Sequence, residues 1–229
     1  MIKIDLHKSI FIGILREIYN DPALRTVLGF KGGTAAHLFY ELPRFSVDLD
    51  FDLLDSGRRE EVFKRVKEIL SKFGTLVEAQ EKKSTLFYLL SYEKGERGLK
   101  VEISKRLSKS QFLVKNYLGV SMLVMREEDV AAGKLSALIT RRKFASRDLF
   151  DLWFFLKNNW QINEEVVNEK TGMSMPEALE KAEGKVMAVK KTELLAGLGD
   201  LLDNKQKAWV KEKLQEELLF LLRLYRSNL

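Results

Sequence analysis

Two short motifs near residue 40 combine a glycine pair with closely spaced carboxylates. The first motif is KGGT at residues 31–34, and the second is SVDLDFDLL at residues 46–54, where Asp48, Asp50 and Asp52 alternate with apolar residues. Strict alternation predicts a strand, so these carboxylates project from one face, about 6 to 7 Å apart along the backbone. Such a row of carboxylates suits divalent metal ions and the transfer of a phosphoryl group.

The same alternation is also typical of an antiparallel strand with one face in solvent. However, aspartate is depleted in strands, and like charges on one face repel each other, so a bound cation is favoured. The chain has no cysteine and only two histidines, His7 and His37, which leaves oxygen ligands and hence Mg²⁺ or Mn²⁺. Glu102 is the best third carboxylate, because it alternates with Val101 and Ile103 on a later predicted strand.

The glycine pair supplies the other half of the predicted site. Glycines ahead of a helix let backbone N–H groups approach a phosphate, and the helix amino terminus adds favourable charge. A lone GGT is a weak signal that matches neither the P-loop nor the dinucleotide-binding motif. Because it lies one short helix before the Asp-x-Asp strand, it predicts a triphosphate cradle beside the metal.

The composition indicates one large domain or two small ones. The chain has 229 residues, 45% of them hydrophobic, with a net charge of +6. The absence of cysteine excludes disulfides and thiolate metal sites. No apolar stretch approaches the ~20 residues of a membrane span, and no signal-peptide cleavage site follows the amino terminus. We therefore expect a soluble, cytoplasmic protein without a membrane partner.

Basic residues gather in two segments that could contact phosphates. These segments contain Lys134, Arg141, Arg142, Lys143 and Arg147, and Lys100, Lys105, Arg106, Lys109 and Lys115. The first segment has no acidic residue between its ends. Either segment could also be a solvated helix face, and composition does not decide between the two interpretations.

The apolar periodicity predicts an α+β fold with a helical second half. Helices are expected at 6–20, at 34–42 and at 59–73, strands at 46–54, 75–82, 84–93 and 99–106, and a turn at KGERG (94–98). After residue 125 the pattern is helical, and it includes one long helix at roughly 203–226. We predict a domain at 1–125, built on a mixed or antiparallel sheet flanked by helices, and a helical domain at 126–229.

These motifs resemble the signature of the nucleotidyltransferase superfamily, in which a glycine pair, a helix and Asp-x-Asp on a strand follow one another. The stretch KGGTAAHLFYELPRFSVDLDF is similar, more narrowly, to the AbiEii/AbiGii-type toxin branch, which includes the MenT-like toxins. Glu102 resembles the third carboxylate of that family, Lys134 in AAGKLSAL its helical lysine, and RDLFDL at 147–152 its closing motif. The resemblance covers residues 30–155 and implies a nucleotidyltransferase-like catalytic domain at 1–125.

The resemblance implies a role for each matching residue. Asp48 and Asp50 would bind Mg²⁺, and Glu102 would be the third carboxylate and general base. Lys134 would neutralise triphosphate charge, and one of Asp148 or Asp151 would complete the site. The nucleotide would be bound by Lys31, Gly32, Gly33, Thr34, Arg44, Ser46 and Lys134.

The residues themselves leave several of these roles open. Asp148 and Asp151 are three residues apart on one predicted helix and share a face, which does not choose between them. Asp148 could instead form a structural ion pair with Arg147 or Arg141. Ser46 could simply begin a strand, and Thr34 could cap the helix.

The aromatic and apolar side chains outside these motifs favour packing roles. His37 is expected to be a partly buried helix residue. Core positions are expected for Trp153, Phe154 and Phe155. The stripe formed by Trp209, Leu218, Leu219, Leu221 and Leu222 could be core or could receive a partner.

The implied activity is magnesium-dependent transfer of a nucleoside monophosphate from an NTP to an acceptor, with release of pyrophosphate. The implied acceptor is the 3′ end of a tRNA, and the implied role is that of a toxin restrained by an antitoxin. A protein or small-molecule hydroxyl is an alternative acceptor, and a non-catalytic module that binds RNA or protein is an alternative function.

Overall fold

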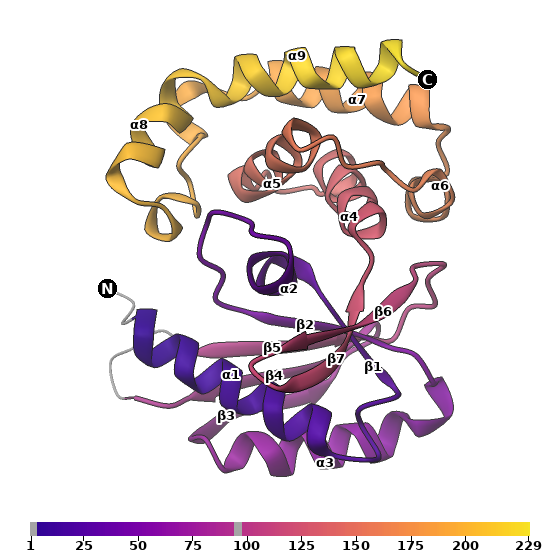
Figure 1. Ribbon diagram of the computed structural model, residues 1–229, viewed down its shortest axis with the longest axis vertical. Helices are drawn as coiled ribbons and strands as arrows, with labels where there is room; N and C mark the ends of the chain where they lie inside the picture. The colour runs from indigo at the N-terminus through magenta and orange to yellow at the C-terminus, as the bar shows by residue number, and fades with distance from the viewer. Residues whose placement is uncertain (1–3, 94–97) are drawn as a thin grey trace. The chain divides into compact units, whose positions relative to one another are not determined.

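The computed structural model describes residues 4–93 and 98–229, so most of the expected KGERG turn lies outside the described residues. The chain divides into two compact units (Figure 1). Unit 1 comprises Met1–Glu41, Ser46–Leu107 and Phe112–Met125, and unit 2 comprises Leu42–Phe45, Ser108–Gln111 and Arg126–Leu229. The main division therefore follows Met125, while two short segments of the amino-terminal half belong to unit 2.

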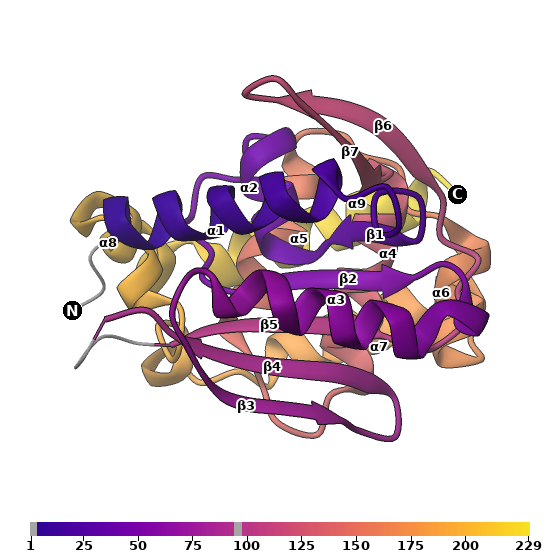
Figure 2. The ribbon, with the colours of Figure 1, turned by 90° about the horizontal axis from the view of Figure 1, so that it is seen from below.

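Unit 1 is built on a mixed sheet that has seven strands within the described residues (Figures 1 and 2). The strands are β1 (Leu28–Lys31), β2 (Leu49–Leu53), β3 (Thr75–Glu81), β4 (Thr85–Ser91), β5 (Leu99–Ser104), β6 (Phe112–Tyr117) and β7 (Val120–Met125). Their order is β3-β4-β5-β2-β1-β7-β6. The pairs β2–β5 and β1–β7 are parallel, and the other neighbours are antiparallel.

The helices of unit 1 are α1 (Ile4–Asn20), α2 (Gly32–Phe39) and α3 (Arg59–Ser71), and a short 3-10 turn, Ser56–Arg58, precedes α3. Figure 2 shows α1 and α3 side by side over one face of the sheet. Phe63 of α3 stacks on Tyr88 of β4, with ring centroids 5.4 Å apart. Tyr88 is in register with Val101, and Val101 with Leu49, so α3 covers the apolar face of these central strands.

The prediction of a mixed sheet flanked by helices is confirmed, but the sequence analysis did not predict three of its strands, β1, β6 and β7. The strands predicted at 75–82, 84–93 and 99–106 form β3, β4 and β5. β1 has only four residues, too few for a clear period. β6 lies at the sheet edge, where its residues are mostly half-exposed or exposed, so burial imposes no alternation. The strand expected at 46–54 is shorter than predicted, because pairing begins at Leu49.

Unit 2 is helical within the described residues. Its helices are α4 (Glu127–Thr140), α5 (Ser146–Lys157), α6 (Glu164–Thr171), α7 (Met175–Met187), α8 (Asn204–Glu212) and α9 (Leu214–Ser227), with 3-10 turns at Lys191–Glu193 and Gly199–Leu201. α4 contacts α5, α6 and α7, while α5 and α7 both contact α9. The single helix expected at 203–226 is wrong, because the chain breaks at Lys213, whose φ of −120° departs from the helical value.

Short capping motifs set several helix limits in unit 2. The side chain of Asn163 accepts hydrogen bonds from the N–H groups of Glu165 and Val166, which starts α6. Gly172, with φ +71°, ends α6 in the left-handed conformation. Ser174 and Glu177 form a capping box at the start of α7. These limits follow from local sequence alone.

The expected aromatic core is confirmed for Trp153 and Phe155, which are buried in unit 2. The indole of Trp153 lies 4.1 Å from that of half-buried Trp209, measured between ring centroids. Leu218 and Leu222 of the carboxyl-terminal stripe are fully buried, so this stripe contributes to the core. Within the described residues, every helix is too short or too polar to cross a lipid bilayer.

Candidate active site

Asp50 and Glu102 are neighbours on adjacent parallel strands of unit 1. Asp50 of β2 is in register with Glu102 of β5. The flanking pairs, Leu49 with Val101 and Phe51 with Ile103, are fully buried on the face that α3 covers. Because side chains alternate between faces, Asp50 and Glu102 project together from the opposite face. Both are partly exposed.

Asp52 shares that face but is bound elsewhere. It lies one step farther along β2, in register with Ser104, and is 4% exposed. Its Oδ1 lies 2.5 Å from Nζ of Lys31, whose own register partner is Asp50. The Lys31 ammonium therefore neutralises Asp52, and Glu102 is the carboxylate beside Asp50.

Asp48 stands just before β2, outside any strand pairing. Thr34, which is buried in the first turn of α2, donates its hydroxyl proton to the carbonyl oxygen of Asp48 at 2.5 Å. This hydroxyl positions the Asp48 backbone and does not cap α2. Ser46 is also buried and lies outside the strand, so it does not begin one.

Gly32 lies against Asp50 and could not be replaced without strain. Its φ of +79° is in the region that L side chains rarely adopt. A Cβ atom added to Gly32 would lie 2.4 Å from Oδ2 and 2.9 Å from Cβ of Asp50. α2 begins here without a side-chain cap, since its N-cap residue is Lys31. Gly32 thus allows the start of α2, including buried Gly33, to meet the carboxylate strand.

The donor set of unit 1 suits a hard divalent ion. No group of three or more His, Cys, Asp or Glu side chains is gathered at metal-binding distance in the part of the chain that the structure describes. The adjacent carboxylates of Asp50 and Glu102, with Asp48 two residues earlier, nevertheless offer the oxygen ligands that Mg²⁺ or Mn²⁺ prefers. Like charges on adjacent strands repel each other, and a cation would remove that repulsion.

In unit 2, Asp151 is fully buried between two cations. Oδ1 and Oδ2 of Asp151 accept hydrogen bonds from Nε and an Nη of Arg44, at 2.5 and 2.7 Å. Nζ of Lys134 lies 2.7 Å from Oδ2 of Asp151. Burial alone would raise the pKa of Asp151, but the charges and hydrogen bonds of Arg44 and Lys134 outweigh burial and hold that pKa below its usual value.

Asp148 shares Lys134 with Asp151. Its Oδ1 lies 3.1 Å from Nζ of Lys134, and its Oδ2 lies 3.0 Å from an Nη atom of Arg141. The ion pair of Asp148 with Arg141, one of the two alternatives expected from the sequence, is therefore present. Arg44, Lys134 and Arg141 against two carboxylates leave this cluster with a net charge of +1 (three minus two).

Both carboxylates of the closing motif, those of Asp148 and Asp151, therefore form ion pairs with Lys134. Their catalytic roles stay predictions. The same is true of the nucleotide contacts predicted for Arg44 and Lys134. In the described arrangement, the guanidinium of Arg44 also donates to the carbonyl oxygen of Phe45. The chief function seen for Arg44 is to hold Asp151.

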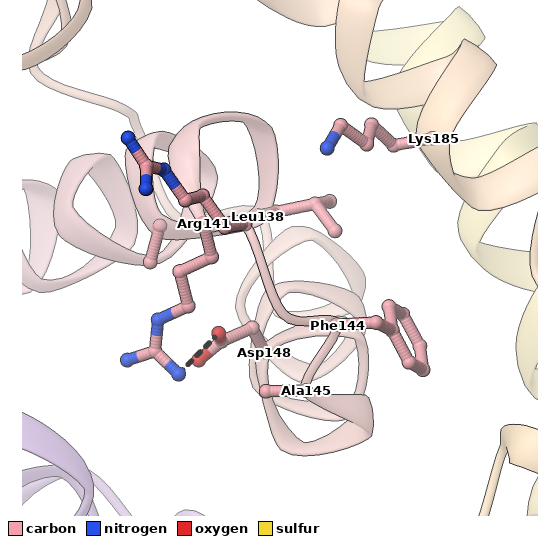
Figure 3. Close-up of a pocket in the computed structure, with 8 residues that line it drawn as sticks. Leu138, Arg141, Phe144, Ala145, Asp148 and Lys185 are labelled. Atoms are coloured by element: carbon pink, nitrogen blue, oxygen red, sulfur yellow. Dashed lines mark ion pairs between the residues drawn. The ribbon is translucent and has the colours of Figure 1, made fainter.

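A pocket in unit 2 is lined by three basic residues, one carboxylate and four apolar residues (Figure 3). Its empty volume, counted together with the open solvent at its mouth, is about 350 Å³. Its lining residues are Ala137, Leu138, Arg141, Arg142, Phe144, Ala145, Asp148 and Lys185. In Figure 3, Lys185 of α7 lies apart from the Arg141–Asp148 ion pair, and the side chain of Leu138 is drawn between them. Among the described residues, Arg142 and Lys185 form no ion pair.

Sequence reasoning placed Arg141 and Arg142 in a basic segment but missed Lys185. Lys185 lies more than forty positions later on α7, and its local sequence carries no signal. Only helix packing brings it to the same pocket. The lining side chains carry three positive charges and one negative charge, a net charge of +2 (three minus one), and the single carboxylate is already paired with Lys134 and Arg141.

Comparisons with known proteins address the fold and the family of this chain. No curated protein sequence matches the chain. A candidate nucleotidyltransferase from H. pylori has a similar structure, with a TM-score of 0.64, 23% identity, and coverage of 99% of this chain and 96% of that one. JHP933 from Helicobacter pylori is also similar, with a TM-score of 0.61, 22% identity, and coverage of 100% and 94%. At these identities the likeness shows the fold.

The sequence comparison identifies the family of the chain. Residues 13–192 match the family described as "Nucleotidyl transferase AbiEii toxin, Type IV TA system". This match spans KGGT, the Asp-x-Asp strand, Glu102, Lys134 and the closing motif. The chain therefore belongs to the AbiEii nucleotidyltransferase toxin family of type IV toxin–antitoxin systems.

Proposed function

We propose that this protein is a metal-dependent nucleotidyltransferase that transfers a nucleoside monophosphate from an NTP to an acceptor hydroxyl and releases pyrophosphate. The observation that carries the proposal is the register of Asp50 with Glu102 on adjacent parallel strands. Two carboxylates on one sheet face, beside the glycine start of α2, are the arrangement that this chemistry needs.

The candidate residues of unit 1 would hold the metal ion, bind the phosphates and accept a proton in the proposed reaction. Asp48, Asp50 and Glu102 would hold Mg²⁺ or Mn²⁺, which supplies charge stabilisation to the transferred phosphoryl group. The N–H groups of Gly33 and Thr34 at the start of α2 bind phosphate oxygens. Glu102 accepts the proton of the acceptor hydroxyl as that oxygen bonds to the α-phosphorus. The bond from the α-phosphorus to the bridging oxygen breaks, and pyrophosphate leaves with its electron pair.

We propose RNA, in particular the 3′ end of a tRNA, as the acceptor. The pocket of unit 2 supports this choice, because three cations, those of Arg141, Arg142 and Lys185, line it together with the aromatic ring of Phe144. Cations bind the phosphates of a strand, and an aromatic ring suits an unstacked base. The proposed role of Lys134 is to neutralise phosphate charge. Membership of a type IV toxin–antitoxin family supports an antitoxin as a further partner.

The activity test uses each of the four α-labelled NTPs with total RNA and Mg²⁺ or Mn²⁺. Label should appear on RNA, disappear with EDTA, and disappear in Asp50→Asn and Glu102→Gln. The matched control is Asp55→Asn, an exposed carboxylate just after β2, which should transfer label like the wild type. Label on a protein or on a small molecule would show that RNA is not the acceptor. RNA binding that is unchanged by Asp50→Asn, without any transfer of label, would show that the protein is a binding module and not an enzyme.

The acceptor test uses the pocket. Arg142→Ala and Lys185→Ala should each raise the KM for RNA while the KM for the NTP stays constant. Each should also reduce the slope of log affinity against log salt by about 1. Lys181→Ala, an exposed lysine on the same helix as Lys185 that does not line the pocket, is the control. Unchanged RNA affinity in both pocket variants would remove the pocket from acceptor binding.

A further inference from the structure

The backbone that carries Asp48 has no strand pairing of its own. β2 begins at Leu49, and residues 45–48 lie outside both helix and strand. The position of a carboxylate on such a segment depends on whatever holds the neighbouring peptide groups. One such contact comes from α2, because Thr34 donates a hydrogen bond to the carbonyl oxygen of Asp48.

The second hold comes from α1. His7 is fully buried, and its Nε2 lies 2.8 Å from the carbonyl oxygen of Val47, the residue before Asp48. A carbonyl oxygen can only accept, so Nε2 must carry the ring proton and donate it. Nδ1 of His7 lies 2.6 Å from the hydroxyl oxygen of Tyr92, which in the neutral ring donates its proton to Nδ1.

We propose that His7 is a positioning residue for Asp48, held in the Nε2–H tautomer by Tyr92. The carbonyl oxygens of Val47 and Asp48 then each accept a hydrogen bond, from His7 of α1 and from Thr34 of α2 respectively. The effect on turnover rests on the proposed nucleotidyl transfer. The tautomer and the local rigidity do not.

A purely structural role accounts poorly for this histidine. α1 is already held by the fully buried side chains of Phe11, Ile14, Leu15 and Ile18. Burying a polar ring costs free energy that must be offset by hydrogen bonds, so packing alone would favour an apolar residue at position 7. Both ring nitrogens of His7 are instead directed at specific oxygen atoms, and one of these belongs to the segment that carries Asp48.

The first test needs no activity. The chain has only two histidines, so His37→Gln leaves the ring of His7 as the single imidazole in a ¹⁵N spectrum. A fixed Nε2–H tautomer is expected, and Tyr92→Phe should weaken that preference. An Nδ1–H tautomer, or the averaged signals of a freely exchanging ring, would overturn the proposal.

The second test measures the segment itself by amide hydrogen exchange. His7→Phe keeps a flat ring but removes both nitrogens. It should speed exchange at residues 47–49 while the paired strand β3 keeps its protection, which also shows that unit 1 remains folded. His7→Gln retains an N–H donor and should exchange more slowly at residues 47–49 than His7→Phe. Equal exchange in the wild type and His7→Phe would overturn the proposal.

The third test measures turnover. A misplaced carboxylate should lower kcat for label transfer by on the order of 10- to 100-fold in His7→Phe, with the KM for the NTP nearly unchanged. His7→Gln should recover part of kcat, and the control His37→Gln should equal the wild type. Full kcat in His7→Phe, or no recovery in His7→Gln, would refute the positioning role. If the wild type itself transfers no label, the proposed function fails. The first two tests still decide whether His7 fixes the backbone beside Asp48.

Discussion

Replacing Gly32 by alanine separates backbone strain from damage to the carboxylate strand. Gly32 and Gly119 both lie in unit 1, with φ of +79° and +81°. A Cβ at Gly119 would meet nothing within 4 Å, whereas one at Gly32 would lie 2.4 Å from Oδ2 of Asp50. Gly119→Ala is therefore a control that imposes the conformational strain without the overlap.

The expected magnitudes follow from these contacts. The left-handed conformation costs an alanine about 1–2 kcal/mol, so both variants should lose at least this much free energy of unfolding. The carboxylate of Asp50 could rotate away from the added methyl group, but the Cβ of Asp50, 2.9 Å from the added atom, moves only with the backbone of β2. Such overpacking adds about 1–3 kcal/mol. Gly32→Ala should therefore be the less stable variant by that difference.

The assay combines unfolding with label transfer. All three tryptophans, Trp153, Trp160 and Trp209, belong to unit 2, so tryptophan fluorescence reports on unit 2 alone. Amide hydrogen exchange in β1 and β2 reports on unit 1. Gly119→Ala should keep wild-type kcat, and Gly32→Ala should lose at least on the order of tenfold, because Asp50 is displaced. Equal stability of the two variants, or full activity in Gly32→Ala, would refute the reasoning.

Three further predictions concern both units. Asp151→Asn leaves Arg44 and Lys134 poorly compensated in the core, so urea unfolding followed by tryptophan fluorescence should show a loss of about 3–5 kcal/mol, whereas Lys109→Ala, which breaks the exposed pair with Glu165, should change stability by at most about 1 kcal/mol. The pKa of Asp151 is lowered in the folded state because its two cations outweigh burial, so the unfolded chain binds the proton more readily. The ionised Asp151 therefore adds to the free energy of unfolding above about pH 4, and this added stability is lost as the pH falls further. In Asp151→Asn, acid unfolding followed by tryptophan fluorescence should lack this pH-dependent loss of stability. A Cβ on Gly29 would lie 2.3 Å from the ring of Phe112, so Gly29→Ala should destabilise unit 1, and a double-mutant cycle with Phe112→Ala should show a coupling of at least about 0.5 kcal/mol; additive losses would contradict the overlap.

Local signals were enough for much of the fold and for the choice of candidate residues. The segments that became β4 and β5 bury every second residue, and this period of two follows from having one face of the sheet against the core. The glycine pair, the Asp-x-Asp segment and the helical carboxyl-terminal half were also legible without a structure. Each of these depends on residues within a few positions of one another, which is the range over which backbone geometry acts.

The pairing of the candidate site residues was decided only by the tertiary structure. Asp50 lies beside Glu102, more than fifty positions away in the sequence, and Arg44 contacts Asp151, more than one hundred positions away. Neither contact leaves a local mark, because a strand's period states which face a residue takes but not which strand will lie beside it. The same holds for the edge strand β6, for Lys185 in the pocket, and for His7, whose ring reads as an ordinary helix position until folding brings Val47 and Tyr92 to its two nitrogens.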